Sequence, residues 1–247
     1  MQAKPLTAVV WDYDGTLVDT REKNLSVTRR LIDTVSPFPA ADLPVLESVE
    51  TYEAALLKVR SWREFYIDYL RLSEEKTDEA GLLWASYQES DTTPVTVFEG
   101  VPLVLEGLRQ VPQGVYSLNS RGNILEALAA SGLSTYFSAV VGYEEVPFAR
   151  QKPEPDGLVL CLNELTGLAP GVVLLIGDHE MDVLSATNAN RYFEAENIDI
   201  RVLSVGVNFR APQHAPSWPA NPDFEATRPE EILDVVASLG GPVKSAG

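Results

Sequence analysis

The sequence predicts a doubly wound α/β core with an inserted helical domain. Five short, continuous apolar runs rich in β-branched residues recur along the chain, at residues 8–11, 114–118, 139–142, 172–176 and 201–207. Continuous apolarity suits strands that are covered on both faces, as in a parallel sheet. Helical patterns lie between the later runs, at residues 123–131 and 156–165. Strands that alternate with helices are typical of the doubly wound architecture.

A long helical segment separates the first run from the second. Residues 20–96 show helical periodicity and little strand signal, Pro37 and Pro39 end the first pattern, and an aromatic-rich stripe at residues 52–69 predicts a second helix with its rings in a bundle core. Residues 77–81 predict a stop and a restart. We therefore expect about four helices in a domain at residues 20–96, inserted into a core made of residues 1–19 and 97–247.

The chain after the fifth run predicts two further elements. Four prolines in residues 212–222 indicate a surface loop. Residues 229–239 follow the pattern of a last amphipathic helix.

The composition limits the partners and the compartment. The 247 residues include 36 acidic and 19 basic side chains, a formal net charge of −17, which repels nucleic acid and anionic membranes, so we expect neither as a partner. The single cysteine, Cys161, excludes a disulfide within the chain and lies in an apolar helical pattern, so we expect it in the core. No signal peptide or membrane span is predicted. We expect a cytoplasmic monomer or homodimer.

Chemically suggestive side chains follow four of the predicted strands, where ligands bind in open α/β sheets. In chain order they are Asp12 and Asp14 after the first run, Ser117 and Asn119 at the end of the second, Lys152 beyond the third, and Asp178 and Asp182 after the fourth. A carboxylate becomes a useful nucleophile toward phosphorus when a divalent cation and fixed donors hold it. A second carboxylate beside it can then move the proton.

Each group alone has a simpler explanation. Aspartate and glycine favour turns, so the segment Asp-Tyr-Asp-Gly-Thr at residues 12–16 could merely end a strand. Ser117 and Asn119 could satisfy backbone amides at a helix start. Lys152 could be a solvated surface lysine, and acids such as Asp178 are favoured in the first turn of a helix.

Together and in this order, the groups resemble the four motifs of the haloacid dehalogenase superfamily, in its phosphoglycolate phosphatase-like and β-phosphoglucomutase-like branch. The chain is similar to that pattern in Asp-x-Asp-Gly-Thr-Leu-Val-Asp-Thr from residue 12, a serine at a strand end, Lys-Pro-x-Pro-Asp from residue 152 and Gly-Asp-x-x-x-Asp from residue 177. The resemblance covers nearly the whole chain. It implies a Rossmann-like core, a helical cap at residues 20–96, Mg²⁺ as cofactor and a small-molecule phosphate ester as substrate.

The resemblance also implies residue roles. Asp12 would be the nucleophile that forms an aspartyl phosphate, and Asp14 the acid that protonates the leaving oxygen and later acts as base. Asp12, Asp178 and the backbone carbonyl of Asp14 would bind Mg²⁺. The remaining roles would be phosphate binding by Thr16, Ser117 and Lys152, and orientation of Lys152 or of a water ligand of the metal by Asp182.

Two positions depart from the family pattern. Leu118 stands where the family often has asparagine after the motif serine, and Asn119 could bind the substrate phosphate from the next position. His179 stands where serine or threonine is frequent, and it could contact the substrate or cap the following helix.

The second acid decides among the reactions of the family. Dehalogenase members lack it and phosphonate-cleaving members carry a small residue there, so Asp14 implies phosphoryl transfer. We expect a Mg²⁺-dependent phosphatase that hydrolyses a small-molecule phosphate monoester. Two alternatives stay open: a sugar phosphomutase, which differs in how it keeps water from the intermediate, and a non-catalytic phosphate- or metal-binding module.

Overall fold

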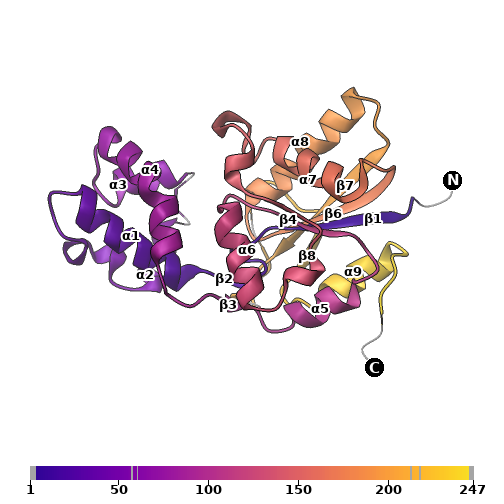
Figure 1. Ribbon diagram of the computed structural model, residues 1–247, viewed down its shortest axis with the longest axis horizontal. Helices are drawn as coiled ribbons and strands as arrows, with labels where there is room; N and C mark the ends of the chain where they lie inside the picture. Colours follow the sequence, from indigo (N-terminus) through magenta and orange to yellow (C-terminus); the bar gives the residue numbers. More distant parts are fainter. Residues whose placement is uncertain (1–3, 57, 60, 212, 217, 245–247) are drawn as a thin grey trace. The chain divides into compact units, whose positions relative to one another are not determined.

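A six-stranded parallel sheet forms the centre of the larger of two units in the computed structural model (Figure 1). The structure describes residues 4–56, 58–59, 61–211, 213–216 and 218–244. The chain forms two compact units, one made of Met1–Asp19 with Val97–Gly247 and the other of Thr20–Thr96. The sheet has the order β5-β4-β1-β6-β7-β8, and every neighbouring pair is parallel. The predicted doubly wound fold is confirmed.

The strands agree with the five predicted runs and add one. They are β1 (Leu6–Trp11), β4 (Gln113–Tyr116), β5 (Ala139–Val141), β6 (Gly171–Gly177), β7 (Ile200–Val207) and β8 (Phe224–Ala226). The last of them is a three-residue edge strand without an apolar run, so its sequence carries no strand signal. A separate two-stranded sheet consists of β2 (Val18–Asp19) and β3 (Thr96–Val97).

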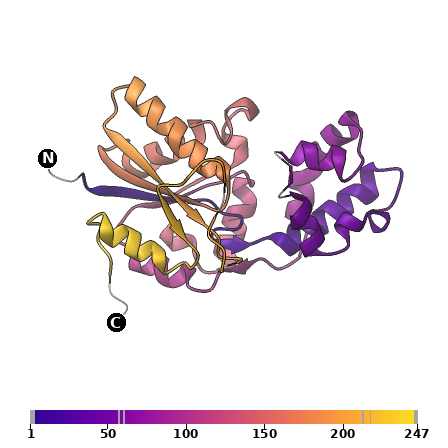
Figure 2. The ribbon, with the colours of Figure 1, turned by 180° about the vertical axis from the view of Figure 1, so that it is seen from behind.

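Helices cover both faces of the sheet. On one face, α7 (Asp156–Thr166) packs on β4 and β5, and α8 (Glu180–Ala195) on β6 and β7. On the other face α5 (Val101–Gly107) packs against α9 (Glu231–Ser238), which the view from behind shows on the side of the sheet opposite α8 (Figure 2). The remaining helices of this unit are α6 (Arg121–Ala130) and the short 3₁₀ turns Ser134–Tyr136, Tyr143–Glu145 and Phe148–Arg150.

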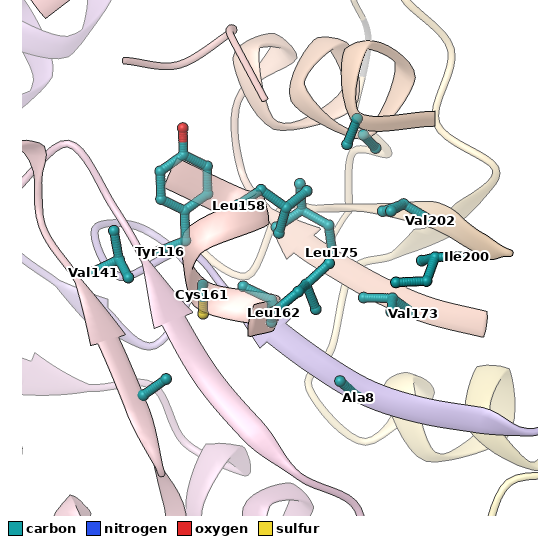
Figure 3. Close-up of a cluster of buried hydrophobic side chains, with 14 of the residues drawn as sticks. Ala8, Tyr116, Val141, Leu158, Cys161, Leu162, Val173, Leu175, Ile200 and Val202 are labelled. Carbon is teal, nitrogen blue, oxygen red and sulfur yellow. The ribbon is translucent and has the colours of Figure 1, made fainter. Parts of the chain in front are cut away.

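A core cluster lies between the sheet and the α7–α8 layer (Figure 3). Alternate residues of β1, Ala8 and Val10, belong to it together with Cys161 of α7. Cys161 is fully buried, so its predicted place in the core is confirmed. On the opposite face, Trp11 Nε1 donates to Gln113 Oε1 at 3.1 Å. Both faces of β1 are thus covered, which is why residues 8–11 are all apolar rather than alternately so.

The second unit is helical. It contains α1 (Arg21–Val35), α2 (Val49–Leu56), α3 (Trp62–Asp68) and α4 (Glu74–Ser90), with 3₁₀ turns at Ala40–Asp42 and Pro44–Leu46. Its core gathers aromatic rings, for example Tyr52 edge-on to Phe65 with 5.3 Å between centroids. The predicted single helix at residues 52–69 is wrong, because Ser61 Oγ accepts from Glu64 N and starts α3 there.

The predicted interruption at residues 77–81 is also wrong, because α4 runs through it. Ser73 caps the start of α4 by accepting from Lys76 N. Gly81 marks a close approach instead of a helix end, since a Cβ there would lie 2.8 Å from the ring of Trp62. Among the described residues, the structure has no helix that is both long and apolar enough to cross a bilayer.

The register of the central strands fixes where the site forms. Trp11 at the end of β1 lies opposite Val115 of β4 and Ile176 of β6. The residues that follow these three strands therefore emerge at one edge of the sheet.

Candidate active site

The turn after β1 presents Asp12 at this edge. Asp12 N donates to Ile176 O at 2.8 Å, which carries the strand pairing one residue past β1 and buries the side chain. The chain then turns, with Leu17 N donating to Tyr13 O at 3.0 Å and Gly15 N to Val18 O at 2.8 Å. Gly15 has φ +77°, and a Cβ there would lie 1.8 Å from Asp178 Oδ2. Only glycine allows the turn to pass so close to that carboxylate.

Lys152 joins two of the predicted acids. Its Nζ donates to Asp12 Oδ1 at 2.8 Å and to Asp182 Oδ1 at 2.6 Å, and it lies 4.7 Å from the centroid of the Tyr116 ring. Burial alone would lower the pKa of Lys152, but the charges of Asp12 and Asp182 outweigh burial and raise it above its usual value. Lys152 is therefore a fixed, fully charged cation between the two carboxylates.

Both carboxylate oxygens of Asp182 accept hydrogen bonds. Besides the contact with Lys152, Asp182 Oδ2 accepts from His179 N at 3.2 Å. His179 is the N-cap of α8, where its Nδ1 accepts from Met181 N at 3.2 Å. Of the two alternatives for His179, the structure shows the capping role. The capping box fixes Asp182 at the first turn of the helix, and Asp182 in turn fixes Lys152.

Asp178, directly after β6, makes an ion pair with a residue that the sequence did not single out. Arg210 Nη1 lies 3.0 Å from Asp178 Oδ2. Burial, together with the nearby carboxylates of Asp12, Asp182 and Asp14, raises the pKa of Asp178 to about 8, although the Arg210 charge lowers it. The sequence held a signal for Arg210, because it follows the fifth apolar run by three residues, as the other groups follow the first four.

Asn119 holds the second predicted acid. Its Nδ2 donates to Asp14 Oδ2 at 3.0 Å, while its Oδ1 accepts from Ser120 N at 2.8 Å and from Asn123 Nδ2 at 2.9 Å. Both ends of the amide are thereby fixed. The side chain predicted to bind phosphate thus faces a carboxylate.

Ser117 and Thr16 are both buried. Ser117 N donates to Val141 O at 3.0 Å, and its Oγ accepts from Asn119 N at 3.3 Å. Thr16 Oγ1 is inaccessible and has no hydrogen-bond partner among the described residues. The structure therefore connects Ser117 to the cluster, whereas it turns the Thr16 hydroxyl to the interior.

The carboxylates fit a divalent cation. Oxygen atoms of Asp12, Asp178 and Asp182 lie within 4.8 Å of one another. The four carboxylates of Asp12, Asp14, Asp178 and Asp182 and the two cations Lys152 and Arg210 sum to a formal charge of −2 for these six groups. Oxygen ligands and this charge suit Mg²⁺.

Comparisons with known proteins identify the family of the chain. The model of the haloacid dehalogenase-like hydrolases matches residues 9–194. Pyrophosphatase PpaX of Bacillus velezensis is 26% identical over 194 residues, covering 76% of this chain and 82% of that protein. Pyrophosphatase PpaX of Oceanobacillus iheyensis is 24% identical over 95% of this chain and 97% of its own length.

Solved structures share the fold. A hydrolase of the same superfamily from Geobacter sulfurreducens, subfamily IA, superposes with a TM-score of 0.64 at 24% identity, covering 95% of this chain and 98% of the other. A predicted phosphoglycolate phosphatase from Haemophilus somnus gives 0.63 at 18% identity, covering 96% and 99%.

Proposed function

Since the chain belongs to the haloacid dehalogenase-like hydrolases, we propose that it is a Mg²⁺-dependent phosphatase that hydrolyses a small-molecule phosphate monoester through an aspartyl phosphate on Asp12. The observation that carries the proposal is the pair of differently held acids after β1. Asp12 is buried, and its Oδ1 accepts from Lys152 Nζ at 2.8 Å, whereas Asp14 Oδ2 accepts from Asn119 Nδ2 at 3.0 Å. One carboxylate is placed beside a cation as a charged nucleophile, and the other is positioned by a neutral amide, which suits a group that must both give and take a proton.

Asp12 and Asp14 have different roles in the proposed reaction, in which Asp12 bonds to phosphorus and Asp14 transfers protons. In the first half, an oxygen of Asp12 forms a bond to phosphorus, the bond from phosphorus to the leaving oxygen breaks, and Asp14 gives that oxygen its proton. In the second half, Asp14 takes a proton from water, the water oxygen bonds to phosphorus, and the bond to Asp12 breaks. Asp14 ends each cycle protonated again, so the enzyme is regenerated.

Asp12, Asp178 and the backbone carbonyl of Asp14 would hold Mg²⁺, which when bound would neutralise charge around the phosphoryl group. Lys152 and Ser117 are the proposed phosphoryl-oxygen donors. Asp182 keeps Lys152 in place through its 2.6 Å contact. Asn119 is proposed to position Asp14 instead of binding phosphate, because both its Nδ2 and its Oδ1 already make hydrogen bonds within the protein. The predicted phosphate contact of Thr16 is left out, since its hydroxyl is inaccessible.

Residues 20–96 are proposed to be the cap that selects the substrate, as the family resemblance implies. Substitutions there should change KM from one substrate to another and leave the need for Asp12 unchanged. Because relatives carry the name pyrophosphatase, inorganic pyrophosphate belongs in the substrate panel beside sugar phosphates, phosphoglycolate and nucleotides. The cytoplasmic location, the monomeric or dimeric state and the lack of nucleic-acid and membrane partners stay predictions.

The test is hydrolysis of p-nitrophenyl phosphate by the purified protein, with Mg²⁺ and with EDTA. We expect turnover that needs the metal and falls to background in Asp12→Asn, while Asp234→Asn, which changes an exposed acid of α9, behaves as wild type. Turnover retained in Asp12→Asn would contradict the mechanism. Release of inorganic phosphate from each substrate separates a phosphatase from a phosphomutase, which would isomerise a sugar phosphate without release. Mg²⁺ binding without any turnover would instead support the binding module.

A further inference from the structure

Arg210 lies in a loop that is anchored on both sides. The preceding Phe209 packs edge-on against Phe98, with 5.9 Å between ring centroids. Asn208 N donates to Ala226 O at 3.0 Å, and Asn208 Oδ1 accepts from Ala211 N at 3.2 Å. The backbone of the loop after β7 is therefore held to β8 and to itself. The Arg210 guanidinium therefore extends into the site from an anchored backbone.

This guanidinium contacts the site on two sides. Arg210 Nη1 lies 3.0 Å from Asp178 Oδ2. A Cβ added to Gly15 would lie 2.5 Å from Arg210 Nη2, which places the guanidinium against the turn that carries Asp12 and Asp14. Arg210 is thus packed between a proposed metal ligand and the backbone of the proposed catalytic turn.

Arg210 and Lys152 are held differently. The Lys152 side chain is 3% exposed and contacts two carboxylates, whereas the Arg210 side chain is 24% exposed. If Asp178 bound a divalent cation, the metal ion and the Arg210 guanidinium would both contact the same carboxylate. Like charges on one carboxylate repel, so either the metal binds more weakly or the guanidinium withdraws. The more exposed of the two cations is the one that can withdraw into water.

We propose that Arg210 is the counter-cation of Asp178. The Arg210 guanidinium neutralises the Asp178 carboxylate in the metal-free protein and dissociates from it when Mg²⁺ binds. The proposal rests on the proposed function, because it takes Asp178 as a metal ligand. Arg210 acts through Asp178 and is therefore a positioning residue. It sets the Mg²⁺ concentration at which the site fills and stabilises the site below that concentration.

The test is the Mg²⁺ dissociation constant, measured by isothermal titration calorimetry on the full-length protein without substrate. In Arg210→Met we expect Mg²⁺ to bind about tenfold more tightly, because a competing positive charge is gone. Arg210→Lys keeps the charge and should stay close to wild type. Arg228→Met is the matched control, since Arg228 pairs with Glu231 on the surface at 2.9 Å.

Thermal unfolding with EDTA and with saturating Mg²⁺ gives a second readout. Arg210→Met should be less stable than wild type in EDTA and should lose this deficit in Mg²⁺. Equal deficits in both conditions, with an unchanged Mg²⁺ dissociation constant, would show a merely structural role and overturn the inference alone. Failure of the wild-type protein to bind Mg²⁺ at all would overturn the inference together with the proposed metal dependence.

Discussion

Replacing Lys152 with methionine removes the cation that two buried carboxylates share. The side chains of Lys152, Asp12 and Asp182 are 3%, 10% and 4% exposed, and the two contacts are 2.8 and 2.6 Å. At an effective dielectric constant of about 20, each contact corresponds to about 6 kcal/mol of Coulomb attraction, most of which the desolvation of the three charges offsets. Leaving the two acids buried without their partner should cost about 3–5 kcal/mol of stability at pH 8.

The cost should depend on pH in a defined direction. Burial already raises the pKa of Asp182 although Lys152 lowers it, and without Lys152 the native pKa of Asp182 should rise further. A carboxylate whose native pKa exceeds its unfolded value, about 3.9, contributes stability that is present below that value and lost as pH rises through the native pKa. The deficit of Lys152→Met should therefore be largest near pH 8 and should shrink as pH falls toward about 5.

The assay is native-state hydrogen exchange of the β1 amides in EDTA, because β1 lies inside the core sheet and reports opening of this unit alone. Adding Asp182→Asn to Lys152→Met removes one uncompensated charge, so the double variant should recover about 1–3 kcal/mol relative to the sum of the single changes. A deficit below about 1 kcal/mol at pH 8, or one that does not change with pH, would refute the electrostatic account of this cluster.

Three further outcomes are expected. Gly15→Ala places a side chain at φ +77° and 1.8 Å from Asp178 Oδ2, so stability should fall by at least about 1–2 kcal/mol in urea titrations and Mg²⁺-dependent kcat by at least about tenfold; wild-type kcat would contradict the role of this turn. His179→Ala removes the N-cap of α8 and should cost about 1 kcal/mol with kcat nearly unchanged, while His179→Asn should restore the loss; a large fall in kcat would instead indicate substrate contact. Burial raises the pKa of the Cys161 thiol, so an aromatic disulfide reagent at pH 8 should label it only after unfolding, and rapid labelling of the native protein would show that α7 opens.

Much of the site followed from the sequence because of how a parallel sheet is built. Asp12, Ser117 and Asp178 follow three adjacent strands, so strand order alone brings them to one edge. Lys152 and Asp182 could be added from motif spacing, and the structure places them in contact at 2.6 Å.

Other features depend on orientations that spacing does not encode. Asn119 could face a phosphate or a carboxylate from the same backbone position, and the contact of its Oδ1 with Ser120 N shows which way its amide is turned. Thr16 follows the motif and yet turns its hydroxyl inward. In the helical unit, Gly81 carries a helix-ending signal locally, but the ring of Trp62 occupies the space that a side chain would need.

The pairing of β1 with β4 has a consequence for how the core folds. Val9 lies opposite Gln113, so the strands that carry Asp12 and Ser117 join across about 100 residues of chain, a long loop to close. The chain leaves and re-enters the core at one point, where Phe98 N donates to Leu17 O at 3.2 Å. If residues 20–96 fold first, the effective loop shrinks to about 30 residues, which lowers the closure cost by about 1 kcal/mol. The inserted helices should then accelerate strand pairing several-fold, and a helical-unit variant such as Phe65→Ala should slow refolding of the core, as pulse-labelling hydrogen exchange of the β1 amides during refolding would show.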